Sequence, residues 1–126
     1  MGKTVAVLGA SGDRRKYGNK AVRAFRQEGW TVYPVNAKAD EIEGLKCYHT
    51  LAETPGPVDR ISVYLPPALG RQLLPEIARK GAREVFFNPG SEDKELVEQA
   101  QTLGIRPILA CSVLSIGRHP EEYPDE

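Results

Sequence analysis

This chain of 126 residues has only two cysteines, no long apolar run and no net charge. The two cysteines, Cys47 and Cys111, are too few for a disulfide-stapled scaffold. No run of about 18 apolar residues is present to form a transmembrane helix, and the apolar segment at 4–8 is too short for the core of a signal peptide. These absences favour a single soluble domain over residues 1–126, located in the cytoplasm.

The net charge is zero, because 17 basic side chains are balanced by 17 acidic ones. This balance argues against a nucleic-acid binder, whose affinity comes from neutralising phosphates. The charges are nevertheless unevenly distributed. Residues 1–38 hold eight basic and two acidic side chains, a net charge of +6, whereas residues 84–126 hold three basic and nine acidic ones, a net charge of −6. A basic third beside an acidic third predicts a local anion site.

Short runs rich in β-branched residues alternate with amphipathic segments along most of the chain. Strands are expected at 4–8, 30–35, 60–65, 84–87 and 105–110. Helices are expected between them, at about 19–28, 66–80 and 91–103. Strands that alternate with helices predict an α/β fold, in which a single doubly wound, mostly parallel, Rossmann-like sheet carries helices on both faces.

Several local signals refine this picture. Asn19 and Ser91 are expected to cap the first and third helices. Pro75 would cost about 3 kcal/mol in a helix interior, so a kink or a later start of the second helix is expected. Residues 36–58 are interpreted as a connection with at most a short strand or helical turn. The acidic tail, from about residue 118 to 126, is expected to fray.

Ligands of doubly wound sheets bind beyond the carboxyl ends of the strands, where the strand order reverses. The first loop at that edge, residues 9–18, has Gly9 and Gly12 where the backbone can approach an anion, and a basic cluster that begins at Arg14. A side chain at Gly9 is expected to block that approach while leaving the fold intact. Ser11 and Arg14 stand where the dinucleotide fingerprint has glycines, so the match is weak. A basic loop without a ligand is the competing interpretation.

The second and third loops help to distinguish between possible nucleotide ligands. A protein that binds NAD normally carries Asp or Glu after its second strand, where the ribose hydroxyls lie. Here Val35 is followed by Asn36 and, two residues later, by Lys38. A lysine suits a nucleotide with an additional phosphate, such as coenzyme A or NADP, although surface lysines are common. The third loop, residues 64–67, presents a stiff apolar surface that suits adenine or pantetheine, or simply starts a helix with proline.

Four segments together carry a resemblance to a known family. They are Gly9-Ala10-Ser11, Tyr33-Pro34-Val35-Asn36-Ala37-Lys38, Ser62-Val63-Tyr64-Leu65-Pro66-Pro67 and Asn88-Pro89-Gly90-Ser91. Their order and spacing, over about Thr4 to Gly117, resemble the small stand-alone CoA-binding domain proteins, which are similar to the amino-terminal domain of the succinyl-CoA synthetase alpha subunit. The resemblance implies a Rossmann-like fold that binds the ADP part of coenzyme A, or of an acyl-CoA, at the switch point of the sheet.

The resemblance also implies how the site is divided among the strand ends. Gly9, Ala10 and Ser11 would hold the diphosphate, Val35 and Asn36 would flank the adenosine, and Lys38 would meet a phosphate. Tyr64, Leu65 and Pro66 would line the path of adenine and pantetheine, and Asn88 would contact pantetheine. Relatives often carry proline just before the lysine, where this chain has Ala37, so the Lys38 loop is expected to be looser.

No catalytic residue and no metal ligand is assigned. The synthetase uses a phosphorylated histidine on a separate domain, and neither His49 nor His119 has a carboxylate partner by spacing. Ser11 lacks the Gly-x-Ser-x-Gly context of a hydrolase nucleophile, and no cluster has metal-ligand spacing. The sequence therefore predicts a non-catalytic binding module with coenzyme A as its cofactor, and neither nucleic acid nor membrane as a partner. Cys111 is interpreted as a buried structural residue or as a thiol that forms a mixed disulfide with CoA.

Two alternatives remain open. The first is an NAD(P)-binding redox sensor or oxidoreductase-like domain, against which the missing carboxylate after Val35 counts. The second is an oligomeric or interaction domain whose nucleotide cleft is vestigial, against which the glycines and Lys38 count. The sequence leaves open an acyl group on the ligand, a protein partner and a homo-oligomer.

Overall fold

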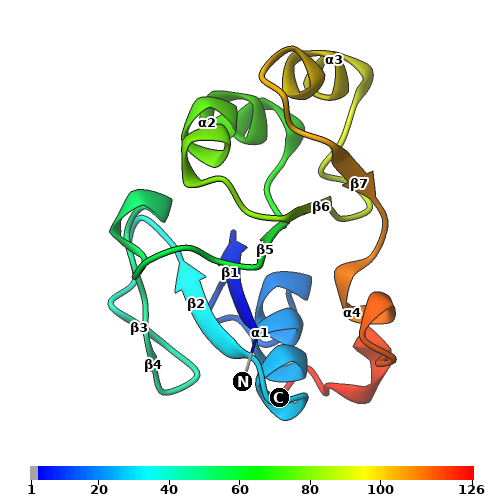
Figure 1. Ribbon diagram of the computed structural model, residues 1–126. Helices are drawn as coiled ribbons and strands as arrows, with labels where there is room; N and C mark the ends of the chain where they lie inside the picture. Colours follow the sequence, from blue (N-terminus) through cyan, green and yellow to red (C-terminus); the bar gives the residue numbers. More distant parts are fainter. Residues whose placement is uncertain (1–2) are drawn as a thin grey trace.

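A five-stranded parallel sheet forms the centre of the computed structural model, which describes residues 3–126. Its strand order is β2-β1-β5-β6-β7, and every neighbouring pair is parallel (Figure 1). The strands are β1 (Thr4–Leu8), β2 (Thr31–Val35), β5 (Arg60–Val63), β6 (Glu84–Phe87) and β7 (Pro107–Leu109). The predicted α/β, Rossmann-like sheet is confirmed, with slightly shorter strands than the apolar runs indicated.

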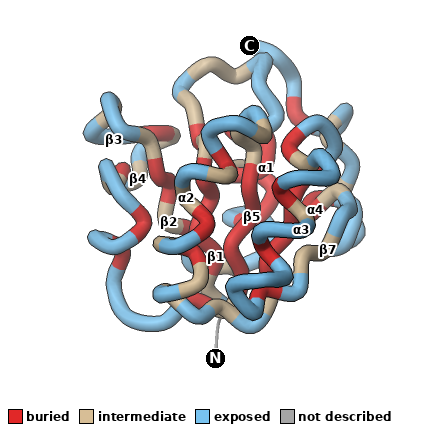
Figure 2. The backbone as a smooth tube through the Cα atoms, turned by 90° about the horizontal axis from the view of Figure 1, so that it is seen from above, coloured by how far each residue is buried: buried red, intermediate tan, exposed pale blue. Residues whose placement is uncertain are grey.

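Helices cover both faces of this sheet, as predicted. In Figure 1, α2 and α3 lie on one side of the strands and α1 and α4 on the other. The helices are α1 (Tyr17–Gln27), α2 (Pro67–Lys80), α3 (Lys94–Thr102) and α4 (Ser112–Ser115). Side chains along β1 point alternately to the two faces of the sheet. Val5 and Val7 therefore join the hydrophobic cluster under α1, whereas Ala6 and Leu8 join the cluster under α2 and α3. Figure 2 shows the buried strands between helices of unequal exposure, since α1 buries most of its residues whereas α2 and α3 bury only a few.

The connection between β2 and β5 holds slightly more structure than predicted. Two short strands, β3 (Glu41–Ile42) and β4 (Leu45–Lys46), form an antiparallel hairpin, and a 3₁₀ turn, η1, spans Leu51–Glu53. Tyr48 forms a bridge with Val35 at the outer side of β2. The hairpin therefore lies next to the edge of the sheet.

Two expectations about helix caps and the later start of α2 are wrong, whereas a kink at Pro75 stays a prediction. Lys16 rather than Asn19 is the N-cap of α1, and Asp93 rather than Ser91 caps α3, its carboxylate accepting a hydrogen bond from the Leu96 amide at 2.8 Å. This bond lowers the pKa of Asp93. Helix α2 starts at Pro67, so Pro75 lies inside it rather than in its first turn. Proline lacks the N–H that would bond to the carbonyl of Arg71, one turn earlier. Pro75 is exposed, so water can solvate that carbonyl.

Both edge strands of the sheet contain a proline. Pro34 lies in β2, opposite Val7 of β1, and Pro107 is the first residue of β7, opposite Val85 of β6. Proline has no N–H to donate to a neighbouring strand, and in sheets it is found mainly at such edges. Among residues 3–126, no helix is long and apolar enough to cross a membrane.

Candidate functional site

A cleft of about 890 Å³ opens at the carboxyl ends of the central strands. Strands β1 and β5 are neighbours there, and the chain leaves β1 towards β2 but leaves β5 towards β6, so the strand order reverses between them. Ligands of doubly wound sheets bind at such a switch point. The cleft is lined by Gly9, Ala10, Ser11, Lys16, Tyr17, Gly18, Asn36, Tyr64, Leu65, Pro66, Asn88, Pro89, Gly90, Ser91, Cys111, Val113, Leu114, His119, Pro120 and Glu121.

Eight of the eleven predicted site residues lie in this lining. The sequence reasoning placed Gly9, Ala10, Ser11, Asn36, Tyr64, Leu65, Pro66 and Asn88 at the site, and the structure brings them together. Arg14, Val35 and Lys38 are not among the lining residues. Val35 is a buried residue of the core, 6% exposed, and Lys38 is exposed on the loop after β2.

Two glycines allow close backbone contacts at the end of β1, Gly9 with Tyr64 after β5 and Gly18 at the start of α1 with Gly9. Gly9 has a positive φ of 86°, and a Cβ atom there would lie 2.7 Å from the carbonyl oxygen of Tyr64. A Cβ atom on Gly18 would collide with the carbonyl oxygen of Gly9. Since only glycine fits at either position, the first turn of α1 stands directly at the cleft, where its free N–H groups and the helix dipole favour an anion. Sequence reasoning missed Gly18, although tight strand–helix packing is the role of the last glycine in dinucleotide fingerprints.

The charged residues of the β1–α1 loop are mostly paired with other protein groups. Arg15 forms an ion pair with Asp13 at 2.8 Å and, by its hydrogen bonds, lowers the pKa of that carboxyl to about 2. Arg14 reaches Glu43 at 3.2 Å and donates to the backbone carbonyl of Glu126 at 2.7 Å. Lys16 is exposed and lines the cleft. The charge available to a ligand in this loop therefore comes from Lys16 rather than from Arg14.

Asn36 holds the first two loops together. Its amide donates to the carbonyl of Ala10 at 2.8 Å, and its side-chain oxygen accepts from the backbone amides of Lys38 and Ala39 at 2.8 and 3.2 Å. The position after β2, where an NAD-binding protein carries a carboxylate, is thus occupied by an amide that organises the loop. This arrangement fixes the start of the Lys38 loop.

Asn88 has a similar structural task at the end of β6. It is buried, and its amide donates to the Ser62 hydroxyl at 3.0 Å and to the carbonyl of Val63 at 2.9 Å. Its side-chain oxygen accepts from the backbone amide of Ser112 at 2.7 Å. The side chain therefore ties α4 to the sheet, and its hydrogen-bonding groups are already occupied by the protein.

The far wall of the cleft comes from the end of the chain, of which sequence reasoning considered only Cys111 as a residue that could meet the ligand. Cys111, Val113 and Leu114 lie along it, and the segment 119–121 borders it. His119 and His49 are both exposed, and each lies near a carboxylate, contrary to the expectation from spacing. His49 Nε2 is 2.9 Å from Asp40 Oδ1, outside the cleft, and His119 Nδ1 is 4.0 Å from Glu121 Oε2.

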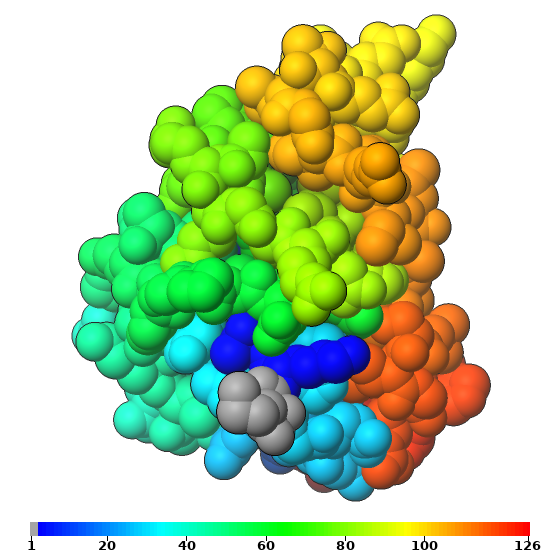
Figure 3. Space-filling model, viewed as in Figure 1, coloured from blue at the N-terminus to red at the C-terminus, as the bar shows by residue number. Residues whose placement is uncertain are grey.

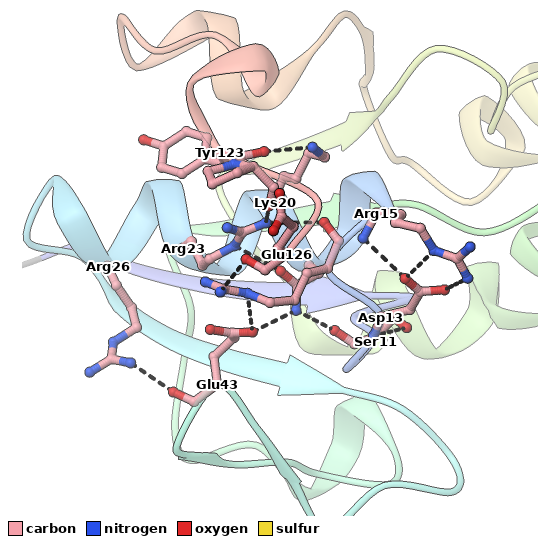
Figure 4. Close-up of polar contacts among 12 residues, drawn as sticks. Ser11, Asp13, Arg15, Lys20, Arg23, Arg26, Glu43, Tyr123 and Glu126 are labelled. Atoms are coloured by element: carbon pink, nitrogen blue, oxygen red, sulfur yellow. Dashed lines mark hydrogen bonds and ion pairs between the residues drawn. The ribbon is translucent and has the colours of Figure 1, made fainter.

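The acidic tail is packed against α1, so the expectation that it frays is wrong. Lys20 donates to the carbonyl of Tyr123 and to the carboxylate of Asp125, both at 2.6 Å, and Arg23 donates to the carbonyl of Pro124 at 2.9 Å (Figure 4). Figure 3 shows the tail, in red, beside the light-blue segment of α1. Tyr123 is 7% exposed. The basic and acidic thirds of the sequence therefore neutralise each other here.

A doubly wound α/β fold with an open cleft and a tight glycine turn at its switch point defines the class of nucleotide-binding domains. The family model for the CoA binding domain matches residues 3–117. The chain therefore belongs to the CoA-binding domain family, and the resemblance found in its motifs is confirmed.

Relatives in this family are both parts of large enzymes and small proteins. The alpha subunit of acetate–CoA ligase [ADP-forming] II from Pyrococcus furiosus is 36% identical over 115 residues, which cover 82% of this chain and 25% of the subunit. A conserved hypothetical protein from P. furiosus superposes with a TM-score of 0.81 at 34% identity, over 91% of this chain and 99% of that one. The dinucleotide forming acetyl-coenzyme A synthetase 1 of Ca. Korarchaeum cryptofilum, in complex with phosphate and ADP, gives a TM-score of 0.74 at 30% identity. The match covers 86% of this chain and 25% of the synthetase chain. The chain thus spans a quarter of the length of the ligase subunit.

Proposed function

We propose that the protein binds coenzyme A, or an acyl-CoA, in the cleft at the switch point and does not itself catalyse a reaction on it. The observation that carries this proposal is the glycine-lined turn at Gly9 and Gly18, which exposes the first turn of α1 to the cleft in a chain of the CoA-binding domain family. The cleft volume of about 890 Å³ lies in the range of about 300–1,000 Å³ that is usual for small-molecule sites.

The ligand would lie across the strand ends. Gly9, Ala10 and Ser11, with Lys16, would hold the diphosphate, because backbone N–H groups at a helix start bind phosphate. Asn36 and the Lys38 loop would flank the adenosine, with the Lys38 ammonium near the additional phosphate of CoA. Tyr64, Leu65 and Pro66 would line the pantetheine.

A role in binding alone is supported by how the polar groups of the cleft are used. The hydroxyl of Ser11 accepts a hydrogen bond from the Asp13 amide at 3.0 Å, and both N–H groups of the Asn88 side chain donate to other protein groups. In the part of the chain that the structure describes, no cluster of His, Cys, Asp and Glu is arranged to hold a metal ion. A protein partner or a longer enzyme assembly would then supply any chemistry, as in the ligases to which this chain is similar.

Isothermal titration with CoA, dephospho-CoA, NADP, NAD and ATP tests the ligand. We expect CoA to bind more tightly than dephospho-CoA by about two- to fivefold, the range for one solvent-exposed charge pair, and NAD and ATP to bind more weakly. Clear binding of NADP without binding of CoA would overturn the proposal. Incubation with acetyl-CoA should leave the thioester intact, and its turnover would contradict the non-catalytic role.

A further inference from the structure

The two free cysteines lie in very different surroundings. Cys47 is 4% exposed, its thiol points at the carbonyls of Asn36 and Tyr48, and burial raises its pKa. Cys111 is partly exposed and lines the cleft. Only Cys111 is therefore placed to meet a molecule that occupies the site.

A second polar side chain, that of Tyr64, lines the same cleft as Cys111. The hydroxyl of Tyr64 is enclosed but forms no hydrogen bond within residues 3–126. Burial raises the pKa of Tyr64, the nearby Ser62 hydroxyl lowers it, and a negative charge on Cys111 raises it. Tyr64 and Cys111 both line the cleft. Buried hydroxyls normally find an acceptor. A thiolate on Cys111 would be such an acceptor.

The strand order directs the thiol end of the ligand towards this pair. The diphosphate lies at the end of β1 in the proposed binding mode, with the adenosine on the side of β2. The remaining part of the ligand then crosses the ends of β5 and β6 towards β7, and Cys111 follows β7 by two residues. Leu65, Val113 and Leu114 give that part of the cleft apolar walls.

From this geometry we propose that Cys111 is a covalent capture site for the disulfide form of coenzyme A, with Tyr64 as its positioning residue. The inference rests on the proposed function. The Cys111 thiol first loses its proton to water. The thiolate attacks one sulfur of a CoA disulfide, the bond between Cys111 and CoA forms, and the second CoA leaves as a thiolate that takes up a proton. Cys111 is oxidised, the released CoA is reduced, and a free thiol reverses the exchange.

The test uses the full chain, reduced and then freed of reductant, and measures adducts by intact mass after addition of CoA disulfide. We expect one CoA per chain, at Cys111. The adduct should be lost in Cys111→Ser and kept in the matched variant Cys47→Ser. Pantethine, which has the same disulfide but no ADP part, should react at least about ten times more slowly, because binding holds the CoA sulfur next to the thiolate. Added 3′-phospho-ADP should slow only the reaction with CoA disulfide.

The Tyr64→Phe variant separates positioning from binding. We expect the limiting rate of exchange at saturating CoA disulfide to fall roughly two- to tenfold, as for the loss of one hydrogen bond. The loss should affect pantethine equally, because it acts on the thiolate. A change confined to the half-saturating concentration would instead make Tyr64 a ligand contact and remove its positioning role.

Two results would overturn the capture site. One is equal rates with CoA disulfide and pantethine, which would make Cys111 an ordinary exposed thiol. The other is the absence of an adduct although reduced CoA, titrated into the wild-type protein with reductant present, releases heat. That titration also separates the two proposals, since an absence of heat with reduced CoA contradicts the binding function itself.

Discussion

The two sides of α1 use different groups to interact with negative charge. On the cleft side, the structure relies on backbone, because Gly9 and Gly18 bring amide groups to the site and Lys16 is the basic side chain of the lining. On the tail side, it relies on side chains, and Lys20 and Arg23 are held by the carbonyls and the carboxylate of the tail. A surplus of basic residues in a sequence is therefore a poor guide to where an anion binds. Much of the surplus serves to hold the chain together.

The largest expected effect on stability comes from adding a side chain at Gly9, on the cleft side of α1. Valine at Gly9 would be strained by the positive φ and would collide with the Tyr64 carbonyl. The fold is therefore expected to lose stability, contrary to the expectation from sequence that it is unaffected. Gly29 is the matched control, with φ 85° and nothing within 4 Å of an added Cβ. Urea unfolding should show a loss of about 1–3 kcal/mol for Gly29→Val and about 1–3 kcal/mol more for Gly9→Val. Equal losses would contradict the close contact.

A smaller loss of stability is expected on the tail side of α1, where Lys20 binds the C-terminal segment. Lys20→Met keeps the length of the side chain but leaves the Tyr123 carbonyl without its donor. We expect a loss of stability of about 1–3 kcal/mol, together with faster amide hydrogen exchange over residues 118–126. The control is Arg15→Met, since the Arg15 side chain is 74% exposed and solvent screens its ion pair with Asp13, which should therefore add much less to stability. Unchanged exchange in the tail of Lys20→Met would show that the ion pairs do not hold it.

The smallest effect distinguishes Lys16, which lines the cleft, from Lys38, which lies on the loop after β2. Lys16→Ala should weaken binding of CoA and of dephospho-CoA by the same factor, about two- to fivefold, because both ligands carry the diphosphate. Lys38→Ala should weaken CoA alone by a similar factor and so remove the preference for CoA. Titration of both variants with both ligands gives the four affinities. A preference for CoA that survives in Lys38→Ala would assign the additional phosphate to another residue.

The elements of the sheet could be predicted because their signals are local. Runs such as residues 4–8 and 84–87 are apolar and β-branched or aromatic, and the loop glycines mark the ends of elements. The switch-point rule then placed the residues after β1 and β5 at one edge without any knowledge of distances. This is why Gly9, Ser11 and Tyr64 fall in the cleft.

The parts that could not be predicted depend on contacts between residues far apart in the sequence. Lys20 and Asp125 are 105 residues apart, and neither carries a local signal of the other. The far wall of the cleft depends on α4, whose start is set by the bond from the Ser112 amide to Asn88. The role of Gly18 carries no local sequence signal, because its close contact with the Gly9 carbonyl exists only after β1 and α1 have packed.

The prolines at the two edges of the sheet have a consequence for the behaviour of many copies together. An exposed edge strand is a template on which other chains can add strands and aggregate. Pro34 and Pro107 interrupt the row of N–H donors at the two opposite edges, and β7 is only three residues long. Continuation of the sheet from one molecule to the next is therefore disfavoured at both ends. The Tyr48 bridge to Val35 adds to this effect at the β2 edge, where it occupies the outer side of the strand.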